Sequence, residues 1–352
     1  MEDLDGLIRR QLGKFEAILD INHCRKCERT CMDVYEFRKV GELPYIIWDS
    51  SVAPDTDWEE FPYNDAFDNP SKMLLNELRL PYFRHQHKDF SAINIRANYG
   101  TVILPSIFGI GYRKLETSMP ASMHLDSRAE VEKLIQKGKP DSRNGLGKNC
   151  FDTAAYYMKV LSDYPKLKKT VRIYHPDLQG PFDVGHLIWG SDIFMAMYDC
   201  PELVHGLLSL VTETYIGWMK KWKEFVGEGN EFTSHWEYYL KGGAMIRNDT
   251  SVMLSSRHYE EFVKPYDQKI LDEFGGGFHY CGKGDNFIEP MCACKNLHAI
   301  NCTQPELNNV NKLIELTQSN RITLMGLHEK YIPENIKTGI IKIITTETRK
   351  IF

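Results

Sequence analysis

Long apolar runs, an excess of basic residues and a regular cysteine framework are all missing from this sequence. No stretch approaches the ~18 consecutive apolar residues that a membrane span needs, so we expect no membrane association. The formal net charge of −5 offers no general attraction to nucleic acid. The amino-terminal segment MEDLDGLIRR is acidic and lacks the basic and apolar regions of a secretory signal. These absences predict a cytoplasmic protein whose partners do not include nucleic acid.

Internal boundaries are also missing. The 352 residues contain no repeat, no low-complexity tract and no linker rich in Pro, Gly or Ser. The nine cysteines are odd in number and unevenly spread, which favours reduced thiols with metal or catalytic roles over a disulfide framework. We therefore predict a single domain covering residues 1–352, with free thiols.

What is present is an alternation of helices and short strands. Residues 1–43 carry apolar side chains at helical spacing, among them Leu12, Phe15 and Ile18, and predict a helical extension at the amino terminus. The segments that follow and that predict strands are 44–50, 100–109, 171–183, 242–251, 278–284, 297–306 and 321–329. Helical segments of ten or more residues lie between most of these runs, which is typical of a parallel α/β protein. We predict a (β/α)8 TIM-type barrel.

Residues that can bind a metal end two of the later strands. His279 and Cys281 are two apart and therefore project to the same side of a strand. A neutral imidazole and a thiolate are both good zinc ligands, and a third ligand is needed. Cys302 ends the next strand and is the natural candidate. The alternative is that His279 is a hydrogen-bonded pocket residue and that both cysteines are small core residues.

Other polar residues lie at the ends of the same strands. Asp249 and Asp177 are the candidate catalytic residues, as general bases or hydrogen-bond acceptors, although carboxylates at strand ends also cap helices. His175, Gln179 and Asn248 are the candidate substrate-binding residues. Active sites of TIM barrels gather at the carboxyl ends of the strands, so we expect these side chains at one mouth.

A second group of cysteines lies near the amino terminus. Cys24, Cys27 and Cys31 are spaced densely enough for a zinc or iron–sulfur site. The same three positions fall on one face of a helix and continue its apolar stripe. We favour packing in the core.

Two segments resemble a known superfamily. FHYCGKGDNFIEPM, preceded by SSRHYEEFVKPYDQKILDEFGGG, is similar to the strand ending in H-x-C-G, and the serine-started helix before it, of the uroporphyrinogen decarboxylase superfamily. HPDLQGPFDVGHLIWGSDIFMAMYDCPELVHGLL resembles that superfamily's third strand and the helix after it. The resemblance covers roughly residues 170–330. It implies a (β/α)8 barrel, and the superfamily includes cobamide-dependent methyltransferases of the methylcobamide:coenzyme M type.

The resemblance implies a zinc-dependent methyltransferase that moves a methyl group between a corrinoid, carried by a partner protein, and a small thiol. By this resemblance His279 and Cys281 are zinc ligands. The family's third ligand is a cysteine in the last strand, whereas this chain has no cysteine after Cys302 and ends ITTETRKIF where the family has a glycine-rich strand. The eighth strand is therefore in question, and nothing indicates the oligomeric state.

Two alternatives stay open. The first is a tetrapyrrole decarboxylase, although the acidic segment after the first predicted strand, DSSVAPDTDWEEF, would repel a polycarboxylate substrate. The second is a barrel that binds a ligand without catalysis. A bound metal would count against both.

Overall fold

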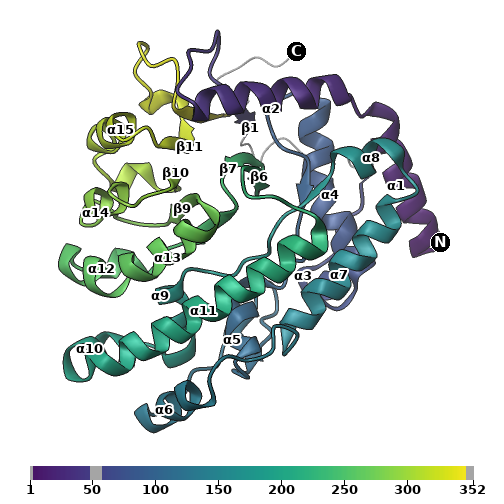
Figure 1. Ribbon diagram of the computed structural model, residues 1–352. Coiled ribbons are helices and arrows are strands. Elements are labelled where there is room, and N and C mark those ends of the chain that lie inside the picture. Colours follow the sequence, from purple (N-terminus) through teal and green to yellow (C-terminus); the bar gives the residue numbers. More distant parts are fainter. Residues whose placement is uncertain (1–2, 48–57, 346–352) are drawn as a thin grey trace.

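A parallel sheet of six strands and a separate parallel pair, with helices between most of the strands, form the framework of the molecule in the computed structural model, which describes residues 3–47 and 58–345 (Figure 1). The six strands pair in the order β1-β12-β11-β10-β9-β8, and the separate pair is β2-β5. Their bounds are β1 Tyr45–Ile47, β2 Asn94–Ile95, β5 Arg172–Ile173, β8 Ala244–Arg247, β9 Gly276–Tyr280, β10 Leu297–Cys302, β11 Thr323–His328 and β12 Ile340–Ile344. The result is a TIM-like α/β fold. Continuous pairing does not close a barrel in the described part of the chain, because β1 is not laddered to β2, nor β5 to β8.

Helices cover the outer side of the strands. Their apolar faces share one core with outward side chains such as Phe278 and Ile300, as expected for parallel strands buried on both faces. The longer helices are α1 Leu4–Ile18, α2 Ile21–Tyr35, α4 Pro70–Gln86, α6 Arg128–Lys137, α7 Leu146–Leu161, α9 Pro181–Trp189, α10 Asp192–Asp199, α11 Pro201–Val226, α12 Ser256–Phe262, α13 Lys264–Phe274 and α15 Val310–Ser319. None of the helices among residues 3–47 and 58–345 combines the length and apolar character needed to cross a bilayer.

A hairpin inserted between α11 and β8 fills part of the interior. Its strands, β6 Phe232–His235 and β7 Tyr238–Lys241, are antiparallel, and α2 lies beside β7 at the top of Figure 1. A second apolar cluster joins the hairpin to α2 and to inward side chains near the starts of the strands: Cys27, Cys31, Val34, Tyr35, Ile46, Ala92, Tyr238, Tyr239, Leu240, Met245, Ala299, Met325 and Ile341. The amino-terminal end of the interior is therefore plugged.

Several predicted elements are confirmed. Serine caps begin α6 and α12, at Ser127 and Ser255, and the helix over 255–274 breaks before Pro265 as expected. The predicted strand 44–50 is seen as Tyr45–Ile47, and its last three residues lie outside the described part of the chain. The helical extension is two helices, α1 and α2, joined by a short turn.

One predicted strand is wrong, and one open question about the strands is answered. Residues 100–109 form a 3-10 turn, Gly100–Val102, and helix α5, Ile103–Ile107, because an apolar run buried on all sides does not distinguish a strand from a short helix. The strand at this place in the fold is the two-residue β2. The eighth strand, which was in question, is β12: its β-branched run IIKII pairs with both β11 and β1.

Candidate metal centre

The alternation of side chains along β9 places His279 on the inner face of the sheet, near its carboxyl end. In the parallel register His279 lies opposite Arg247 of β8 and Asn301 of β10, so these three inward side chains form one row. Phe278 and Tyr280, on the other face, contact the covering helices. Gly282, at φ +102°, turns the chain away immediately after Cys281.

His279, Cys281 and Asp249 converge on one point. One ligand-type atom from each, a ring nitrogen, a thiol sulfur and a carboxylate oxygen, lies within 4.8 Å of the other two. The His279 Nε2 is 3.3 Å from the Cys281 Sγ and 3.4 Å from the Asp249 Oδ1. Bonds of about 2.0–2.3 Å at tetrahedral angles would hold such atoms about 3.3–3.6 Å apart. The separations from His279 therefore fit a zinc-sized ion.

Backbone contacts fix the position of Asp249. Its Oδ1 accepts the backbone N–H of Cys281 at 2.8 Å, which ties the loop after β8 to the loop after β9. The buried carboxylate of Asp183, on α9, accepts the N–H groups of Asp249 and Thr250, both at 2.9 Å. Burial, together with the charge of Asp249, raises the pKa of Asp183 to about 7. The third ligand-type oxygen is therefore held from two sides.

Asn301 determines which ring nitrogen of His279 faces Asp249 and Cys281. The Asn301 Nδ2 donates to the backbone carbonyl of Met325 at 2.8 Å, which orients its amide. Its Oδ1 must then accept from the His279 Nδ1–H, at 2.7 Å. The remaining nitrogen, Nε2, points to Asp249 and Cys281. This is the arrangement of a metal-binding histidine with an outer-shell acceptor.

Protonation competes with metal binding at the same nitrogen. Burial alone would lower the pKa of His279, but hydrogen bonds to Asp249 and Cys281 outweigh it and raise that pKa to about 9. Burial opposes ionisation of Asp249 in turn, and the hydrogen bond and charge of His279 outweigh it and lower the pKa of Asp249. In the metal-free protein at neutral pH, His279 and Asp249 therefore form an imidazolium–carboxylate pair.

Cys302 does not join the group. On β10 it lies opposite Tyr280, not His279, so its side chain is on the face turned toward the helices. Its sulfur is 3.5 Å from the Asn308 Nδ2, and burial raises the pKa of its thiol to about 11. The inward residue at the end of this strand is Thr303, whose hydroxyl is 3.0 Å from the Cys281 sulfur. The prediction that Cys302 is the third ligand is therefore wrong, because Cys302 faces outward, toward the helices, and the next residue, Thr303, faces inward.

Asp177 belongs to a separate, buried ion-pair cluster. The Arg247 guanidinium and the Gln179 amide bind its carboxylate, and the Arg96 Nη1 is 3.7 Å away. The cluster is next to the metal group but not part of it: the Trp236 ring, at the hairpin tip, has Arg247 4.5 Å from its centre and contacts the His279 ring. Sequence patterns gave no signal for Trp236.

The predicted substrate-binding residues have other partners. His175 accepts the Met245 N–H and lies against the Pro176 carbonyl, and burial lowers its pKa to about 3. Gln179 binds Asp177, and Asn248 donates to the buried carboxylate of Asp267. None of the three lines the cavity beside His279.

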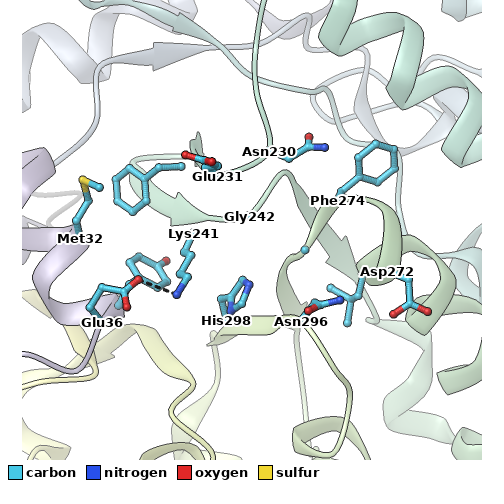
Figure 2. Close-up of a pocket in the computed structure, with 14 residues that line it drawn as sticks. Met32, Glu36, Asn230, Glu231, Lys241, Gly242, Asp272, Phe274, Asn296 and His298 are labelled. Carbon is cyan, nitrogen blue, oxygen red and sulfur yellow. Dashed lines mark hydrogen bonds and ion pairs between the residues drawn. The ribbon is translucent and has the colours of Figure 1, made fainter.

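That cavity has a volume of about 220 Å³ and lies between the hairpin tip and the carboxyl halves of the strands. A larger cavity of about 480 Å³ lies at the opposite end, where Gly242, Gly275 and His298 are near strand starts (Figure 2). There Lys241 pairs with Glu36 at 2.7 Å. No predicted site residue lines this larger cavity.

The amino-terminal cysteines pack in the core. Cys27 and Cys31 are buried in the cluster under the hairpin, and Cys24 is buried in the main core. Across residues 3–47 and 58–345, the grouping of metal-ligand atoms at Asp249, His279 and Cys281 is the one that meets the 4.8 Å spacing.

The chain shares its fold with a methyltransferase from Methanosarcina mazei. The two structures superpose with a TM-score of 0.63 over 90% of this chain and 92% of that one. Their sequences are 14% identical, so the likeness shows the fold alone. No model of a known protein family matches the chain, and no curated protein is similar to it in sequence.

Proposed function

We propose that the protein is a zinc-dependent methyltransferase that moves a methyl group from a corrinoid, presented by a partner protein, to a small thiol. The observation that carries the proposal is the spacing of the Cys281 sulfur and the Asp249 oxygen, 3.3 Å and 3.4 Å from the His279 Nε2. The fold shared with a methyltransferase is consistent with it. Asp249 takes the place that we first gave to Cys302.

Zinc held there would supply a Lewis acid with an open position, which favours the thiolate form of a thiol bound at it. The chain's own residues do the rest. Asn301 holds the Nε2 of His279 toward the ion, and the Thr303 hydroxyl is placed to donate to the Cys281 sulfur. A methylated corrinoid would supply the methyl group, which would pass to the sulfur of the thiol, and the electron pair of the broken carbon–cobalt bond would stay with the corrinoid.

The test combines metal content with turnover. Protein purified without a histidine tag should hold about one zinc per chain, and the zinc-loaded protein should convert methylcobalamin and a thiol to the thioether. Removing zinc with a chelator should abolish this reaction. Porphyrinogen decarboxylation that persists after chelation would favour the tetrapyrrole alternative instead.

Metal affinity should rise with pH. Because the pKa of His279 is about 9 in the metal-free protein, a proton must leave Nε2 when a metal binds at neutral pH. The apparent affinity should fall about tenfold for each pH unit below 9 from this proton alone, and this contribution should level off above pH 9. Competition titrations between pH 6.5 and 9.5 measure the slope, and a flat profile would contradict the assignment of His279.

Asn301 should matter for metal affinity although it is not a ligand. Asn301→Ala removes the acceptor that fixes the His279 tautomer, and loss of an outer-shell partner costs about 10–100-fold in affinity. Asn320→Ala is the matched control, because the Asn320 side chain is exposed and donates to the Leu316 carbonyl at the end of α15. Equal affinities in the two variants would show that Asn301 does not orient the ring.

A further inference from the structure

The cavity beside His279 is a small chamber with a fixed wall. It is lined by Trp236, Glu237, Tyr238, His279, Asn301, Thr303, Gly326 and Ile343. Its volume of about 220 Å³ is less than half the 480 Å³ of the cavity at the opposite end. Gly326, at φ +74°, leaves room for the hairpin, since a Cβ there would lie 2.6 Å from the Tyr238 hydroxyl.

Trp236 holds that wall in place. The residue has a left-handed backbone, at φ +48°, a conformation that surrounding contacts must compensate. Its ring contacts both His235 and His279, with ring centres 4.7 Å and 4.8 Å apart, in addition to the Arg247 guanidinium. The chamber is therefore a shaped space next to the metal group.

The charges around the chamber are unfavourable to an anion. Among residues 3–47 and 58–345, no Lys or Arg lines it, whereas Glu237 does. Arg84 is 3.4 Å from Glu237 but lines a different cavity on the other side of that residue. Arg247 is bound to Asp177. The nearby guanidinium groups are thus already paired with carboxylates.

We propose that the thiol acceptor taken by this chamber is a small molecule without an acidic group; the inference rests on the proposed function. A divalent metal with the Cys281 thiolate and the Asp249 carboxylate is neutral, so a bound thiolate already adds one negative charge. A sulfonate or carboxylate tail would bring a second negative charge into the chamber, where Arg84 and Arg247 are already paired with carboxylates and no other described Lys or Arg lines the wall. Burying such an unpaired charge is costly. An uncharged or ammonium tail avoids this cost.

Three thiols that share a two-carbon chain test the inference. Protein loaded with Co²⁺, whose thiolate absorption reports binding directly, is titrated with 2-mercaptoethanol, 2-aminoethanethiol and 2-mercaptoethanesulfonate, and each dissociation constant is corrected for the thiol's own pKa. The sulfonate should bind at least about tenfold more weakly than the neutral thiol. Equal or tighter binding of the sulfonate overturns the inference. A wild-type protein that binds no cobalt overturns the proposed function, and with it this inference.

A substitution inside the chamber sharpens the test. Ile343→Lys places a cation in the lining without touching a metal ligand, and it should bring the sulfonate to at least the affinity of the neutral thiol. Ile18→Lys, on the exposed face of α1, is the matched control and should keep the wild-type order. If the lysine disturbs folding, Glu237→Gln should still reduce the penalty on the sulfonate severalfold. A penalty that stays unchanged in both chamber variants contradicts the inference.

Discussion

Replacing Cys281 with alanine is expected to weaken zinc binding by at least about a hundredfold. The thiolate is one of three ligand atoms in the group, and its loss leaves only a nitrogen and an oxygen, whereas even an outer-shell change costs about 10–100-fold. Competition with a chromophoric chelator measures the affinity, and cobalt absorption reports whether a thiolate is still bound.

Cys302→Ala is the control for that experiment. The two cysteines lie at the ends of neighbouring strands, but Cys302 is turned to the helix face and lies near Asn308. Its replacement should leave metal affinity within about twofold and cost only core packing, roughly 1 kcal/mol of stability for a small buried side chain. The opposite order, in which Cys302→Ala loses the metal and Cys281→Ala keeps it, would refute the ligand assignment.

Replacing Arg247 with methionine is expected to lower the free energy of unfolding by about 3–5 kcal/mol. The Arg247 and Asp177 side chains are only 9% and 2% exposed, and removing one partner of a buried pair leaves the other charge without compensation. Arg96, with its Nη1 3.7 Å from Asp177, places the expected value toward the lower end. Urea unfolding monitored by tryptophan fluorescence measures the change.

A surface pair provides the contrast. Arg38 and Asp33 are 67% and 33% exposed, so Arg38→Met should cost less than about 1 kcal/mol. The double variant Arg247→Met with Asp177→Leu should recover part of the loss, because it removes the stranded carboxylate. If Arg247→Met were no more harmful than Arg38→Met, the buried cluster would not contribute to stability in this way.

Local patterns predicted the carboxyl-terminal half of the fold well. Strands β8 to β11 are short apolar runs that end in polar groups, and helices separate them, with side-chain caps at the starts of α12 and α15. The residue pattern and the capping residues therefore indicate the same elements. The first half was harder to predict. Strands β2 and β5 contain two residues each, which is too short for alternation to show, and α5 is apolar enough to resemble a buried strand.

The site could be predicted only to the level of single strands. H-x-C gave the inward pair His279 and Cys281 correctly, and the same rule applied to N-x-T at the end of β10 would have placed Asn301 and Thr303 inward and Cys302 outward. The position of Asp249 beside them depends on the parallel register of β8 and β9 and on support from Asp183. Contacts between segments that are distant in the chain produce no recognisable local pattern in the sequence.

The hairpin β6–β7 shapes the chamber without contributing any of the candidate metal ligands. All three candidate metal ligands lie in or just after strands of the sheet. The wall of the chamber beside them is instead an insertion between α11 and β8, outside the repeating strand–helix units. A longer, shorter or differently tipped hairpin would alter the size and polarity of the chamber while leaving the ligand-bearing strands in register. Under the proposed function, a lineage with this fold could therefore exchange one small acceptor for another by varying a few residues around position 236, without any change in the candidate metal ligands.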